Sequence, residues 1–168
     1  MAVTADPGRR SVADTLAGIA LLLGIPALLA LKSAYAGWYL VILIWLGGVF
    51  LVIAWALAWV IAFQTFFARR NAFAVTGGVV RMRIAAWLHT AALALAGAIA
   101  PDGGDDAPYP SVLGAMLGLP TGDQQDLVLV AYLALLAGAL VFVWIVAEWI
   151  TALVLRRRAR TVAPGGPR

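Results

Sequence analysis

The sequence predicts an all-α integral membrane protein, a four-helix transmembrane bundle with both termini cytoplasmic. Three observations lead to this fold class. Hydrophobic residues make up 64% of the 168 residues and the mean hydropathy is +0.96, whereas soluble domains are roughly 45–50% apolar. Four hydrophobic stretches have about the 20 residues that a bilayer-spanning helix needs. Basic residues flank these stretches, as the positive-inside rule describes.

The first predicted span covers residues 12–31 and follows a short cytoplasmic segment, residues 1–11. Ser11 has the position of a helix cap, and Pro26 is expected to kink the span. A signal peptide cleaved after Ala34-Tyr35-Ala36 is the alternative, because a basic start, an apolar run and small residues at both ends of this tripeptide also fit such a peptide. We favour a retained helix, since the run is longer than the 7–15 residues of a signal core and no exported domain would follow cleavage.

The second predicted span, residues 38–63, is interrupted only by Gly47 and Gly48. Its tryptophans recur at nearly helical spacing, which favours packing or lipid contact at the membrane interfaces. The third predicted span, residues 79–100, begins with arginines whose long side chains are expected to reach toward the headgroups.

The fourth predicted span, residues 127–155, is a long hydrophobic run with one carboxylate, Glu148, and it leads into a cluster of arginines. The four spans together define a transmembrane domain over residues 12–160. The last residues, 161–168, are rich in glycine and proline, so we expect a disordered C-terminal tail.

The distribution of basic residues predicts the orientation. With both termini inside, Lys32 is the one basic residue of twelve that lies outside. The reverse topology would export the other eleven, against the positive-inside rule. The predicted location is the cytoplasmic membrane of a bacterium, because the abundance of arginine and alanine is typical of a GC-rich bacterial genome.

Two ionisable residues, His89 and Glu148, lie well inside the predicted spans. A charge at a helix centre costs roughly 2.5–3.5 kcal/mol on insertion scales, so such residues usually face a bundle interior and find a partner. Both lie in the cytoplasmic half of the bilayer, which makes an intramembrane polar pair geometrically possible. Such a pair would either fasten two helices or handle protons or cations, and the third possibility is that the two never meet.

Small residues follow alternating steps of three and four along the last span, among them Ala131, Ala134 and Gly138. Glu148 falls on the same line. A row of small residues lets helix backbones approach closely, so this helix-packing seam predicts a neighbouring helix.

The connection between the last two spans, residues 101–126, is acidic. Its carboxylates Asp102, Asp105 and Asp106 are a candidate external cation site, because hard cations take oxygen ligands. Their spacing does not match a calcium loop, and a solvated loop explains the charges equally well. The apolar stretch 111–119 is too short to span the membrane and predicts a short helix on or near its surface.

The sequence also excludes several classes of site. Without cysteine it has no disulfide and no thiolate metal site, and one histidine cannot supply both axial ligands of a bis-histidine haem. We recognise no hydrolase or zinc-protease motif. The sequence therefore predicts no catalytic residue, cofactor or metal, and its basic residues flank spans instead of forming a nucleic-acid surface.

The leading functional hypothesis is a small non-catalytic multi-pass membrane protein, a subunit or scaffold of a membrane assembly. Its expected partners are the lipid bilayer and either further copies of itself or a larger membrane complex. The alternative is a small proton- or cation-coupled transporter or channel component that uses Glu148 with His89. A third hypothesis is an enzyme subunit whose site is completed by a partner.

Overall fold

The computed structural model describes residues 11–68, 73, 77–103, 108–124 and 126–162, and this part of the chain is mostly helical. Four of its helices, α1, α3, α4 and α6, are long and apolar enough to cross a membrane. The elements in chain order are α1 (Val12–Ser33), α2 (Trp38–Trp45), α3 (Gly48–Thr65), α4 (Val79–Ile99), β1 (Asp102–Gly103), β2 (Pro108–Tyr109), α5 (Val112–Met116), the 3-10 helix η2 (Thr121–Gln124) and α6 (Asp126–Val162).

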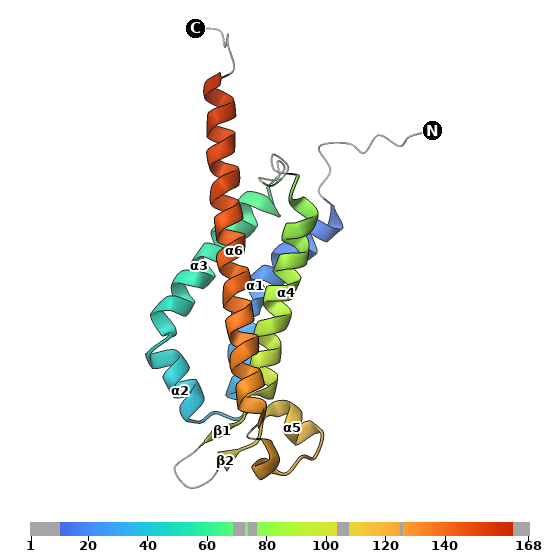
Figure 1. Ribbon diagram of the computed structural model, residues 1–168, viewed down its shortest axis with the longest axis vertical. Coiled ribbons are helices and arrows are strands. Elements are labelled where there is room, and N and C mark those ends of the chain that lie inside the picture. The colour runs from blue at the N-terminus through green and yellow to red at the C-terminus, as the bar shows by residue number, and fades with distance from the viewer. Residues whose placement is uncertain (1–10, 69–72, 74–76, 104–107, 125, 163–168) are drawn as a thin grey trace, which may run out of the picture.

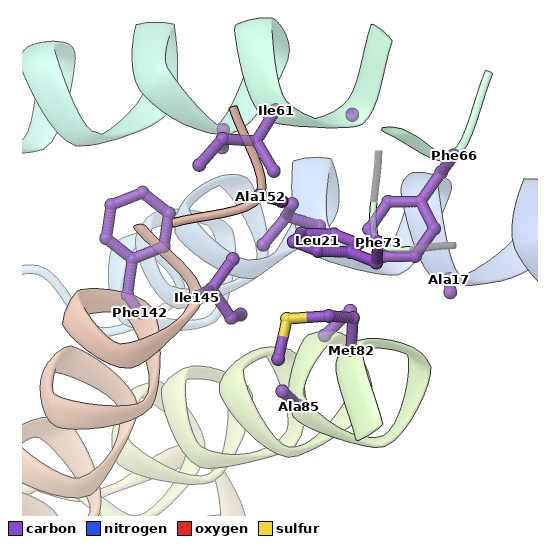
Figure 2. Packing of buried hydrophobic residues seen from close by; sticks show 13 residues of the cluster. Ala17, Leu21, Ile61, Phe66, Phe73, Met82, Ala85, Phe142, Ile145 and Ala152 are labelled. Atoms are coloured by element: carbon purple, nitrogen blue, oxygen red, sulfur yellow. The ribbon is translucent and has the colours of Figure 1, made fainter. Parts of the chain in front are cut away.

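Helix α4 lies between α1 and α6, and these three helices form the closely packed part of the protein (Figure 1). At one end, here called the terminal end, α1 and α4 begin and α3 and α6 finish. The opposite end, here called the hairpin end, carries β1, β2 and α5. Side chains from four helices meet in the core near the terminal end (Figure 2), among them Leu21, Ile61, Phe66, Met82 and Ile145.

Helix α1 begins where the sequence predicts and continues through its proline. The Ser11 hydroxyl accepts a hydrogen bond from the Ala13 amide at 3.2 Å, so it caps the helix. Pro26 has no amide hydrogen and leaves the carbonyl oxygen of Leu22 without its helical donor. The indole nitrogen of Trp55 donates to that oxygen at 3.1 Å. A proline in α1 thus creates the acceptor that attaches α3.

The predicted second span is two helices, because α2 ends at Trp45 and α3 begins at Gly48. Glycine is a poor helix former, which explains why the break falls at this pair. No residue of α2 is buried, and the buried residues of α3 all lie in its second half, from Ala58 to Thr65. In Figure 1, α2 and α3 bow away from α6.

The connection at the hairpin end is folded, with more structure than the predicted surface helix. Strands β1 and β2 pair antiparallel, and α5 has five residues. The buried side chain of Gln124 holds the segment together: its Oε1 accepts from the amide and hydroxyl of Ser111 at 2.8 and 2.9 Å, and its Nε2 donates to the Leu119 carbonyl at 3.0 Å. A side chain on Gly114 would occupy the place of this amide.

Helix α6 has 37 residues and is about 56 Å long at 1.5 Å per residue. It continues beyond the beginnings of α1 and α4 and carries the arginine cluster in its final turns (Figure 1). The helix reaches Val162, so the first two residues of the predicted disordered tail are helical. Residues 163–168 of that tail and residues 1–10 of the predicted cytoplasmic segment lie outside the described residues.

Candidate functional site

His89 lies in the centre of the three-helix core. Its Nδ1 is 2.9 Å from the carbonyl oxygen of Gly138 on α6, and its side chain is buried. Because a carbonyl can only accept, Nδ1 is the donor in this bond. The ring packs on Phe142 with 5.2 Å between ring centres, and a Cβ on Gly24 of α1 would lie 3.0 Å from it. His89 therefore joins α4 to α6 in space that a glycine of α1 leaves open.

Glu148 has a different partner, and the structure does not bring it together with His89. The Glu148 carboxylate accepts from Arg81 of α4 at 2.8 Å, in an ion pair whose arginine side chain is 57% exposed. Gly138, the partner of His89, is about 15 Å from Glu148 along α6 at 1.5 Å per residue. Almost three turns of α6 therefore separate the contacts of the two residues that the sequence predicts as a candidate pair.

A second ion pair lies beside the first at the terminal end. Arg83 of α4 donates from Nε to Asp14 of α1 at 2.8 Å. The two arginines at the beginning of α4 thus bind its two neighbours, Arg81 on α6 and Arg83 on α1. Instead of reaching only for headgroups, as the sequence predicts, both arginines connect helices.

The most buried charges are at the hairpin end, where Lys32 meets Asp102. The Lys32 ammonium is 3.0 Å from Asp102 Oδ2, and both side chains are 1% exposed. The same ammonium donates to the carbonyl of Ala100 at 3.0 Å and lies over the ring of Tyr39, 5.3 Å from its centre. The buried ammonium therefore has a carboxylate, a carbonyl oxygen and an aromatic ring around it.

Asp102 is equally saturated. Besides Lys32, it accepts from the amides of Gly37 at 3.1 Å, Tyr39 at 2.7 Å and its neighbour Gly103 at 2.8 Å. The first two amides belong to the beginning of α2, where a negative charge is favoured by the helix dipole. A Cβ on Gly37 would lie 2.6 Å from the carbonyl oxygen of Gly103, so this close approach needs glycine. Asp102 thus caps α2 from a distant part of the chain.

Burial by itself raises the pKa of the Asp102 carboxyl, but the hydrogen bonds outweigh it. The Tyr39 amide and the Lys32 ammonium both favour the carboxylate, and the net result is a pKa below the ordinary value of 3.8. Asp102 is therefore a carboxylate at neutral pH. This pair was not predicted; the available signal was one lysine and a group of aspartates assigned to the same side of the membrane.

These contacts decide how far the predicted cation site is supported. Asp102, its first member, already binds an ammonium and three amides, which leaves no lone pair directed at a free ion. Asp105 and Asp106 lie outside the described residues. Within the described part of the chain, no group of three His, Cys, Asp or Glu residues is placed to hold a metal.

The predicted small-residue seam faces α4. A Cβ on Gly138 would lie 2.9 Å from a methyl group of Leu93 and 3.4 Å from Ala92. Ala131 is buried with Ile99 and Ala100 at the hairpin end, and Ala134 is half-buried. The neighbouring helix that the seam predicts therefore belongs to the same chain.

A cavity of about 370 Å³ opens beside the Lys32–Asp102 pair, between α2, the strands and the beginning of α6. Its walls include the aromatic side chains of Trp38, Tyr39 and Tyr132, and Asp102 forms part of the rim with its oxygens already in use. The cavity therefore suits an apolar or aromatic group better than a cation.

Comparison of the chain with models of known protein families, with curated proteins and with solved structures finds no match.

Proposed function

We propose that this chain is a non-catalytic multi-pass membrane protein that acts as a small subunit or scaffold of a membrane assembly. The observation that carries the proposal is the use of its polar groups. His89, Glu148, Asp102 and Asp14 each bind another part of the same chain, and each contact joins two helices or a helix and a loop. Such contacts stabilise a fold, whereas a catalytic or transport site directs free polar groups into an accessible cavity. Asp102 does line a cavity, but its oxygens are already bound by Lys32 and three amides.

The spacing of the ion pairs supports insertion in a bilayer. Asp14 and Lys32, which belong to ion pairs at opposite ends, are about 27 Å apart along α1 at 1.5 Å per residue. Glu148, in the third ion pair, is about 33 Å along α6 from Asp126, the acidic first residue of that helix. The hydrocarbon core of a bilayer is about 30 Å thick. The pairs at the two ends therefore fit the two boundaries of the hydrocarbon, with His89 between them.

The proposed orientation has both termini in the cytoplasm of a bacterial cell, which places the terminal end inside and the hairpin end outside. The support is the charge distribution, since Lys32 is the one basic residue assigned to the outside. The burial of Ala17, Leu21 and Leu28 against the other helices supports retention of α1. Reporter fusions at Gly104 and at the C-terminus test this topology, and an external C-terminus would overturn it.

Association with a partner is proposed for α2 and α3. The small-residue seam is already used against α4, whereas α2 and the first half of α3 expose large apolar side chains; Trp45, Phe50 and Val52 are 84, 73 and 66% exposed. Lipid covers such a surface in a free protein, and a partner helix covers it in an assembly. A further copy of the chain or a larger membrane complex would therefore bind here.

Purification from native membranes with mild detergent tests the assembly. We expect a species larger than one chain, and replacement of Trp45 and Phe50 by alanine should reduce it to the monomer. The matched control replaces Leu16 and Leu23, half-exposed residues of α1, and should leave the assembly intact. Recovery of the wild-type chain alone, as a monomer, would contradict the scaffold proposal.

The alternative functions make different predictions for the same variant. A proton- or cation-coupled transporter that uses Glu148 with His89 should lose pH-dependent flux in proteoliposomes on Glu148→Gln, with its assembly unchanged. The scaffold proposal predicts no such flux in the wild type. An enzyme subunit completed by a partner would show activity only with the purified complex.

A further inference from the structure

A groove of about 250 Å³ runs between α4 and α6 on the outside of the bundle. Arg81, Ile84, Ala85 and Leu88 of α4 line one wall, and Val141 and Trp144 of α6 line the other. The residues of α4 follow steps of three and four, so the groove runs parallel to the helix for about 10 Å from Arg81 to Leu88 at 1.5 Å per residue. The surface of the groove is apolar throughout, and Arg81 lines one end of it with the carbon atoms of its side chain, whose guanidinium binds Glu148.

The position of the cation gives the groove a direction. Arg81 lies at the terminal end, and its side chain remains 57% exposed although one nitrogen binds Glu148. A guanidinium has five N–H donors in a planar fork, a geometry that matches phosphate oxygens. Ile84 and Leu88 are more than half exposed and face away from the core. In the proposed membrane placement, Arg81 is at the headgroup boundary and Leu88 is within the hydrocarbon.

We propose that this groove binds one membrane phospholipid, with its phosphate on Arg81 and an acyl chain along Ile84, Leu88, Val141 and Trp144. The order of charge and apolar surface along the groove matches the order of groups in a phospholipid. The inference rests on the membrane insertion proposed above but not on any partner protein. Glu148 moderates the positive charge of Arg81, so its removal should strengthen the binding of the phosphate.

Native mass spectrometry of the delipidated protein in detergent, with added dioleoyl phosphatidylglycerol, tests the site. We expect the wild type to retain one lipid and Arg81→Gln to lower the apparent affinity at least about tenfold, the size expected for loss of a hydrogen bond to a charged group. Arg83→Gln is the matched control, because Arg83 is on the same helix end but is not part of the groove. Dioleoylglycerol, which lacks the phosphate, should bind no better to the wild type than to Arg81→Gln.

A second pair of variants tests the apolar part without touching a charge. Leu88→Trp fills the groove from a side chain that is 56% exposed, so it should fold and yet lose the lipid. Leu23→Trp, at a position on α1 that is 51% exposed, should retain it. Glu148→Gln should bind at least as tightly as the wild type.

The proposal is overturned if Arg81→Gln and Arg83→Gln bind alike, if Leu88→Trp retains the lipid, or if Glu148→Gln loses it. Absence of retained lipid on the wild type would also overturn it. Membrane insertion is judged separately: a wild-type chain that needs detergent for extraction but retains no lipid contradicts the groove and leaves insertion standing.

Discussion

The two ends of the helical bundle use the same kind of ion pair in different surroundings. At the hairpin end, Lys32 and Asp102 are each 1% exposed and bind each other and further backbone groups. At the terminal end, the side chains of Arg81 and Glu148 are 57 and 18% exposed. Burial removes the competition from water, so the loss of one partner leaves a charge that nothing else can stabilise. The hairpin end should therefore be far more sensitive to substitution than the terminal end.

The largest expected effect is that of Asp102→Asn. It leaves the buried Lys32 ammonium without a counter-charge, which costs about 3–5 kcal/mol in known buried pairs. Unfolding of the detergent-solubilised protein with dodecyl sulfate measures the loss. The double variant Lys32→Met with Asp102→Asn should recover most of it, because no unpaired charge remains. Equal stability of the single and double variants would contradict this account.

Acid should weaken the hairpin end selectively. Because the pKa of Asp102 is lower in the folded protein than its ordinary value of 3.8, the pair contributes fully above that value. Its contribution is lost as the pH falls through the lower pKa of the folded state. The free energy of unfolding, measured between about pH 6 and about pH 3, should fall more in the wild type than in the double variant. Parallel pH profiles would show that Asp102 is not responsible.

The next largest loss of stability is expected where α1 and α4 pack closely near the hairpin end. A Cβ on Gly97 would lie 2.8 Å from the backbone oxygen of Leu28, which cannot move without shifting α1. Gly97→Ala should therefore cost about 1–3 kcal/mol, as overpacked cores do. Gly138→Ala is the control, since its Cβ would meet side-chain atoms of Leu93, which can shift, and Ala92 at an ordinary contact distance, but no backbone atom within the three nearest. Denaturant titration should find Gly138→Ala the more stable variant; the reverse order would mean that the helices adjust easily here.

The smallest effect is expected at the terminal end. Asp14→Asn and Glu148→Gln each remove an ion pair that water already reaches, and such pairs contribute about 0.2–1 kcal/mol. Added salt should reduce even this difference. Measured losses as large as that of Asp102→Asn would remove the distinction between the two ends.

The positions of the long helices could be predicted from the sequence, because they follow from the lengths of the hydrophobic runs. The predicted third span, residues 79–100, agrees with α4 to within one residue, and α1 begins at the predicted Val12. The predicted second span is divided into two helices because glycine has a low helix propensity, which a hydropathy pattern does not include. Composition and periodicity therefore predict most of the fold.

The contacts between helices were harder to predict. His89 and Glu148 were assigned to adjacent helices at similar depth, but the register of α4 against α6 places Arg81 opposite Glu148 and a backbone carbonyl opposite His89. Gln124 binds mainly backbone groups, which leave no pattern in the side chains. Depth along a helix can be counted from the sequence, but rotation and register depend on packing.

The hydrogen bond from Trp55 to Leu22 has a consequence for the order in which the protein assembles. A single α1 helix in hydrocarbon would carry an unpaired carbonyl above Pro26, which no lipid chain can satisfy. Helix α3 follows in the chain and brings the donor. The first two long helices, α1 and α3, are therefore expected to associate in the bilayer before α4 and α6 are inserted. The carbonyl that Pro26 leaves unpaired thus favours this order of assembly.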